Sequence, residues 1–201
     1  MRLLRLLVFV LIGMASGVPA HAQLDDVSWS ALRIMRIDGR EFRTRVNHER
    51  LRERISGDVG GVELTLILRS DRNLAWQLMP LMMVYAEADV SAMDTPANVR
   101  IASREALGEE VLAGQRVTKY RAVFQARNGA RQTGLLWQNA QGVHVKSRFS
   151  VADRSGRERL VELELRELQV GPQPAALFEI PAGYRRIDVD IGSALGELFG
   201  F

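Results

Sequence analysis

The sequence predicts a mainly β protein built from one antiparallel sheet. Apolar and polar residues alternate with a period of two in segments such as 41–47, 62–69, 143–149 and 161–166, which is typical of strands with one solvated face. Short turn signals separate these segments; Asp38-Gly39, for example, favours a two-residue hairpin. We therefore expect about eleven strands in one long meander, near residues 30–37, 41–47, 51–56, 62–69, 73–79, 83–87, 102–111, 115–126, 131–139, 143–151 and 159–170.

The N-terminal segment 1–22 is expected to be a signal peptide. It has a basic start at Arg2 and Arg5, a short apolar run and the small-x-small sequence Ala20-His21-Ala22. We expect cleavage near Ala22 and export through the general secretion pathway to the periplasm, without stable membrane insertion. The chain has no cysteine, so it offers neither a disulfide nor an acylation site. Residues 23–187 are then predicted to form one domain, followed by a tail at 188–201.

The most apolar mature stretch is Asn73–Ala88, which holds no cation. Its alternation predicts that Trp76 and Leu78 are core residues, and that Met79, Met82 and Met83 lie nearer the mouth of a concave face. Methionine is unbranched and polarisable, so it suits a deformable binding surface. The alternative is two ordinary buried strands that meet at Pro80. The predicted ligand-binding residues are Trp76, Met79, Met82, Met83, Tyr85 and Trp137.

Helical content is expected to be small. A helical turn could form at Asp25–Ala31 and another at Pro174–Leu177, and the irregular segment Asp89–Asn98 could form a short helix or a flap. The tail segment Asp190–Phe199 has apolar residues at helical spacing, although two glycines weaken that helix by about 1 kcal/mol each.

Charge and motifs exclude several functions. Without Arg2 and Arg5, 25 of the 27 basic side chains remain against 24 acidic ones, a net charge of +1 that does not support nucleic-acid binding. The two mature histidines, His48 and His144, lie on separate predicted strands, lack metal-ligand spacing and are expected to be solvated. No nucleophile elbow, phosphate loop or dinucleotide motif is present. We therefore expect no enzyme, no cofactor and no metal.

An arginine-rich region is the main polar candidate. Arg43 and Arg45 share one strand face, and Arg52 and Arg54 share another. If the two strands pair, the four guanidinium groups form a patch for lipid phosphates or an acidic partner. The alternative is a solvated outer face paired with neighbouring glutamates at positions 41, 49 and 53.

Several motifs together resemble the periplasmic lipoprotein-carrier (Lol-type) half-barrel superfamily, and most closely its uncharacterised outer-membrane lipoprotein-sorting relatives. They are Arg69-Ser70-Asp71, Trp76-x-x-Met79-Pro80, the Gly142–Lys146 segment and, most specifically, Phe178-Glu179-Ile180-Pro181-Ala182-Gly183-Tyr184. The resemblance spans nearly all of residues 30–187. It implies a strongly curved, incomplete β-barrel with a few short helices and an apolar concavity.

The expected function is that of a soluble periplasmic protein that binds an apolar ligand, carrying or sensing lipid or a lipidated protein in the cell envelope. The alternative is a non-catalytic interaction or sensor module of envelope assembly, with a self-filled core and another envelope protein as partner. The sequence leaves both open.

Overall fold

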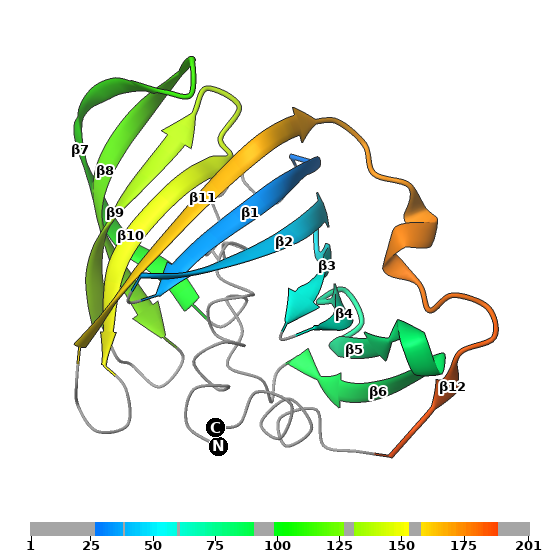
Figure 1. The fold of residues 1–201 in the computed structure, drawn as a ribbon. Helices are drawn as coiled ribbons and strands as arrows, with labels where there is room; N and C mark the ends of the chain where they lie inside the picture. Colours follow the sequence, from blue (N-terminus) through cyan, green and yellow to red (C-terminus); the bar gives the residue numbers. More distant parts are fainter. Residues whose placement is uncertain are drawn as a thin grey trace.

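A computed structural model describes residues 27–37, 39–59, 61–90, 99–126, 131–152 and 158–188. These residues form one curved, unclosed sheet of twelve strands (Figure 1). The strands are β1 (Trp29–Ile37), β2 (Arg40–Glu49), β3 (Arg52–Val59), β4 (Val62–Arg69), β5 (Leu74–Met79), β6 (Val84–Asp89), β7 (Val99–Leu112), β8 (Gln115–Ala126), β9 (Arg131–Asn139), β10 (His144–Ala152), β11 (Glu158–Val170) and β12 (Arg185–Arg186). The predicted mainly β, strongly curved, incomplete barrel is therefore confirmed.

The order of the strands differs from a single meander. It runs β12-β6-β5-β4-β3-β2-β1-β11-β10-β9-β8-β7, so two meanders, β1–β6 and β7–β11, join where β1 pairs with β11. Consecutive strands within each meander are antiparallel, as their alternation predicts. All eleven expected strands are present, but β12, a two-residue parallel partner of β6, was not predicted. Its two residues are too few to show a periodic pattern.

One face of the sheet forms the interior. Residues directly opposite each other in antiparallel strands share a face, and the pairs Val46–Ile55 and Met35–Leu163 place these side chains on the same side. Two apolar clusters on this side combine strands that lie far apart in the sheet order. Met79 of β5, for instance, shares a cluster with Leu163 of β11. Such strands meet only across the hollow of a curved sheet, so we call this side the interior face.

Two glycines permit close approach between strands. A Cβ on Gly134 of β9 would lie 2.7 Å from the Arg148 carbonyl oxygen and 2.7 Å from the Phe149 Cβ. A Cβ on Gly57 of β3 would lie 2.8 Å from the Arg43 carbonyl oxygen. Glycine within a strand is typical of a tight bend in a curved sheet.

The outer face carries the C-terminal segment 171–188, which we call the strap. It leaves β11, forms the 3₁₀ turn η4 (Ala175–Phe178) and then pairs with β6 through β12 (Figure 1). The predicted helical turn near Pro174–Leu177 is thus confirmed, shifted by one residue. Phe178 is fully buried in a third apolar cluster with Ile67, Trp76 and Leu78.

Other local predictions have different outcomes. The helical turn expected at Asp25–Ala31 is wrong, because β1 begins at Trp29 and pairs on both sides. A second 3₁₀ turn, η1 (Pro80–Met82), connects β5 to β6. The signal peptide, most of Asp89–Asn98 and the tail helix lie outside the described residues, so these expectations and the domain limits remain predictions.

Candidate ligand-binding face and strap

The interior face is lined mainly by apolar side chains from both meanders. The first cluster contains Met35, Met79 and small or branched residues of β4, β6 and β11. Phe42 and Phe149 are only partly buried and pack at its margin. The second cluster contains residues such as Trp29, Ala75 and Val145, again from distant strands. The interior face is therefore chemically suited to an apolar ligand.

A charged group interrupts this apolar lining. Arg33 Nη2 donates a hydrogen bond to Glu53 Oε1 across 2.8 Å, and His48 Nδ1 lies 3.5 Å from Glu53 Oε2. The His48 ring also stacks on Trp29, with 5.3 Å between ring centroids. Burial raises the pKa of Glu53, but the Arg33 charge and the neighbouring His48 ring outweigh burial and hold the pKa below its ordinary value. Glu53 is therefore a carboxylate at neutral pH.

A second polar side chain lies on the same face. Gln77 is opposite Ala86 and Leu66 in the register and is 2% exposed. Within the described part of the chain, both polar atoms of its side chain lack a hydrogen-bond partner. A buried amide without partners is unfavourable, so Gln77 offers hydrogen-bonding capacity inside an apolar environment.

The predicted ligand-binding residues do not come together. Met79 is buried on the interior face, whereas Trp76 and Tyr85 belong to the cluster beneath the strap on the outer face. Met82 and Met83 are exposed at the turn between β5 and β6. The alternation correctly predicts that Trp76 and Leu78 are core residues, but their core is the one that the strap covers.

Trp137 is buried in the second cluster. Its indole N–H donates to the Glu110 carboxylate, and the ammonium groups of Lys119 and Lys146 lie 5.1 and 5.2 Å from its ring centroid. These cation–π contacts cover the ring of a side chain that also packs in the second apolar cluster. Whether Trp137 binds a ligand remains a prediction.

The predicted arginine patch lies on the outer face, where its members contact other parts of the chain. Arg43 pairs with Glu41, and Arg45 with Glu167. The guanidinium group of Arg52 lies 5.0 Å from the Phe178 ring centroid, and Arg54 donates to the Leu177 carbonyl oxygen across 3.2 Å. The two β3 arginines therefore hold the strap, and a head-group role for the patch remains a prediction.

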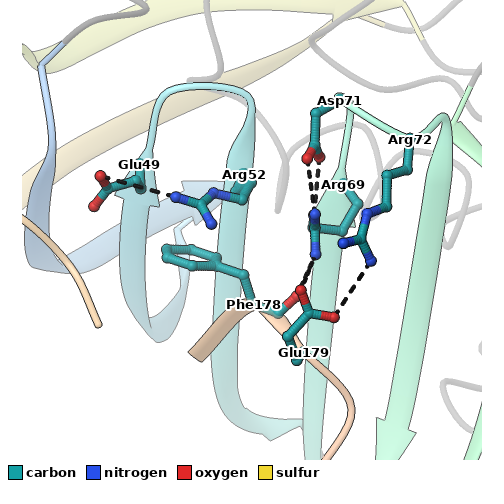
Figure 2. A network of polar contacts seen from close by, with 7 residues as sticks. All are labelled: Glu49, Arg52, Arg69, Asp71, Arg72, Phe178 and Glu179. Atoms are coloured by element: carbon teal, nitrogen blue, oxygen red, sulfur yellow. Dashed lines mark hydrogen bonds and ion pairs between the residues drawn. The ribbon is translucent and has the colours of Figure 1, made fainter. Parts of the chain in front are cut away.

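Arg69 is the centre of a network that fixes the strap (Figure 2). Its guanidinium group makes two 2.8 Å hydrogen bonds to the Asp71 carboxylate and also donates to the Glu179 carboxylate and the Phe178 carbonyl oxygen. Arg72, in contrast, reaches Glu179 at 3.5 Å from an exposed position. The hydrogen bond from Arg69 lowers the pKa of Asp71. Both halves of this network belong to motifs quoted for the resemblance, but nothing in their strand patterns indicates that they meet.

The expectation of solvated histidines is wrong. His48 and His144 are 4% and 6% exposed. Burial, together with the nearby Arg104 charge, lowers the pKa of His144 to about 3, so its ring is neutral at physiological pH. The alternation marked His144 as polar and therefore outward, but the β-bulge between His144 and Lys146 changes which side chains turn inward.

Three further observations concern metal binding, membrane-spanning helices and a pocket in the described residues. They contain no group of three or more acidic, histidine or cysteine side chains placed to hold a metal ion. They also contain no helix long and apolar enough to cross a membrane. A pocket of about 470 Å³ lies beside the turn between β9 and β10, and its lining includes Arg116, Gln141 and Leu168.

Comparison with known proteins bears on the fold. No protein-family model matches the sequence, and no curated protein matches it. Among solved structures, an uncharacterized conserved protein from Thermus thermophilus is similar over 81% of this chain and 90% of its own, with a TM-score of 0.53 and 16% identity. A chain of the Pseudomonas aeruginosa MucA/MucB complex is similar over 80% of this chain and 59% of its own, with a TM-score of 0.50 and 15% identity.

A LolA-superfamily protein from Nitrosomonas europaea is similar over 78% of this chain and 94% of its own, with a TM-score of 0.41 and 10% identity. The chain shares its fold with the Thermus thermophilus protein and with the matched chain of the MucA/MucB complex. At 10–16% identity these likenesses concern the fold alone. The present chain spans about three fifths of the length of the chain it matches in the MucA/MucB complex.

Proposed function

We propose that this protein binds an apolar ligand, a lipid or a lipidated protein, on its interior face, in the cell envelope and without catalysis. The main support is the apolar lining that both meanders contribute to one side of the curved sheet. About ten methylene groups removed from water would contribute about 8 kcal/mol, which corresponds to about micromolar affinity before the costs of association.

Two kinds of residue in the first cluster suit this role: its flexible methionines and the aromatic residues at its margin. Met35 and Met79 can repack around acyl chains because their side chains are unbranched. Phe42 and Phe149 are partly buried at the margin of the same cluster, where a ligand would enter. Gln77 would supply hydrogen bonds to an ester or amide group of such a ligand.

The direct test is native mass spectrometry of protein purified from its own cell envelope, together with uptake of a fluorescent fatty acid. We expect bound lipid and saturable uptake. An apo mass together with no uptake would contradict the proposal.

A matched pair of variants locates the site. Phe149→Ser removes an aromatic ring at the margin of the interior face and should weaken fatty-acid affinity by about tenfold, the effect of about 1.4 kcal/mol. Tyr85→Ser removes a ring of similar size from the cluster beneath the strap and should leave affinity unchanged. Equal losses in both variants would show that the interior face is not the specific site.

A second candidate function is a protein-interaction module. Within the described sheet β7 pairs only with β8, and the side chains of residues 102–109 are exposed. An unpaired edge strand is a ready template for strand addition by a partner. A photo-crosslinking amino acid in place of Val111, which is 68% exposed, should give one discrete adduct in intact cells if this function holds. A smear of adducts, or none, would contradict it.

A further inference from the structure

The turn between β5 and β6 carries three successive exposed apolar residues, Leu81, Met82 and Met83, which we call the apolar tip. Their exposed fractions are 82%, 61% and 49%. No charged residue occurs from Asn73 to Ala86. Isolated exposed apolar side chains are ordinary on protein surfaces, but three in succession at one turn form a local patch.

The backbone holds the tip in a defined shape. Pro80 begins η1, and the Met83 N–H donates to the Pro80 carbonyl oxygen across 3.1 Å with Met83 in the left-handed region (φ 50°). The Met83 carbonyl oxygen in turn accepts from the Arg185 N–H across 3.0 Å. Gly183 lies against Met83, because a Cβ at Gly183 would be 2.9 Å from the Met83 Cε. The tip is therefore fixed by the end of the strap.

This arrangement places cations beside the apolar tip. Arg185 and Arg186 of β12 pair with the first two residues of β6, at the same end of the β5–β6 hairpin as η1 (Figure 1). Both side chains are exposed. Arg186 Nη1 lies 3.0 Å from Glu87 Oε1, whereas Arg185 makes no ion pair within the described part of the chain. Apolar side chains at a protruding turn with neighbouring arginines match the layered chemistry of an anionic bilayer surface, which has phosphates above acyl chains.

We propose that the apolar tip inserts shallowly into an anionic membrane surface while Arg185 and Arg186 contact lipid phosphates. This peripheral contact is separate from the interior face and from stable membrane insertion. A protein partner fits less well, because a specific protein interface buries about 800 Å² on each side, and a three-residue projection is much smaller. The proposal goes beyond ligand binding: it identifies where the protein would meet the membrane.

The test uses sedimentation of the mature protein with vesicles of phosphatidylethanolamine and phosphatidylglycerol, and with vesicles of phosphatidylcholine alone. We expect binding to the anionic vesicles only. The double variant Leu81→Asp, Met82→Asp should bind at least about tenfold more weakly. The control is Leu51→Asp, at a residue that is 50% exposed in the turn between β2 and β3, and it should bind like the wild type. Circular dichroism checks that each variant folds.

A second variant tests the cations. Arg185→Gln, Arg186→Gln should abolish the preference for anionic vesicles and the sensitivity of binding to salt. The proposal is overturned if the wild type binds no vesicles, if the Leu81/Met82 variant binds like the wild type, or if Leu51→Asp loses as much. It is equally overturned if the tip cross-links to a protein while the Leu81/Met82 substitutions leave vesicle binding unaffected.

Fatty-acid uptake by the same variants separates this proposal from the proposed function. The tip lies outside the interior clusters, so uptake should be unchanged in the Leu81/Met82 variant. Tip-dependent vesicle binding without any uptake would leave the membrane contact standing and refute ligand carriage. Uptake without vesicle binding would refute the membrane contact alone.

Discussion

Arg33 and Glu53 form an ion pair of 2.8 Å in which both side chains are buried, although β2 separates their strands in the sheet. Removing one partner leaves an uncompensated buried charge, so Arg33→Met or Glu53→Met should each lower the free energy of unfolding by about 3–5 kcal/mol. Urea denaturation measures this change.

The double variant Arg33→Met, Glu53→Met provides the control. It removes both charges, so it should be clearly more stable than either single variant. If the two single losses simply add in the double variant, the pair is not energetically coupled.

Stability should also depend on pH through His144, whose pKa falls from 6.5 to about 3 in the fold. Between these two pH values, the His144 ring is protonated in the unfolded chain and neutral in the folded chain. The stabilisation is present above pH 6.5 and is lost as pH falls from 6.5 toward 3, at up to about 1.4 kcal/mol per pH unit. Urea unfolding at pH values between about 6.5 and about 5.5, above the ordinary glutamate pKa of 4.5, measures the slope.

His144→Leu is the matched variant for this prediction. It cannot take up a proton, so its unfolding free energy should depend less steeply on pH than that of the wild type. Parallel slopes in the two proteins would show that His144 is not the group responsible.

The strands were predictable because their alternation is a local property. Residues such as Val46 and Leu64 alternate with polar neighbours wherever one strand face is buried, so the strand positions follow from the sequence. The pairing of β1 with β11 is not local. It joins Met35 to Leu163 across most of the chain, and no short-range pattern distinguishes it from continued pairing of β6 with β7.

The candidate site was less predictable, because alternation identifies two faces without saying which one is interior. Trp76 and Met79 are three residues apart on one strand and point to opposite faces, so only one of them could line the interior. The strap adds a second buried surface on the outer face. Because the strap packs on this face, Trp76 and the β3 arginines contact it, and the alternation of the strands could not reveal these contacts.

Curvature should depend on Gly134. Its missing Cβ leaves room for the Arg148 carbonyl oxygen and the Phe149 Cβ, both of which would lie 2.7 Å from an added methyl group. Both are parts of the main chain or fixed to it, so Gly134→Ala should lower the free energy of unfolding by about 1–3 kcal/mol through overpacking. Thr133→Ala, at the exposed neighbouring position, should change it by less than about 0.5 kcal/mol. Thermal and urea unfolding measure the free energy of unfolding of both variants. Similar losses would show that the close approach of β10 to Gly134 does not limit stability.

Attachment of the strap should depend on Arg69 far more than on Arg72. Arg69 is buried and bonds Asp71, Glu179 and the Phe178 carbonyl oxygen, whereas Arg72 is half exposed and reaches Glu179 at 3.5 Å. Arg69→Met leaves those acceptors unpaired, so it should lower the free energy of unfolding by several kcal/mol and expose the strap to protease. Arg72→Met removes one exposed pair and should cost less than about 1 kcal/mol. Limited proteolysis followed by mass spectrometry of the fragments reports release of the strap directly. If both variants release it equally, the network around Arg69 does not hold the strap, and its other contacts, such as the burial of Phe178 and the pairing of β12 with β6, must do so.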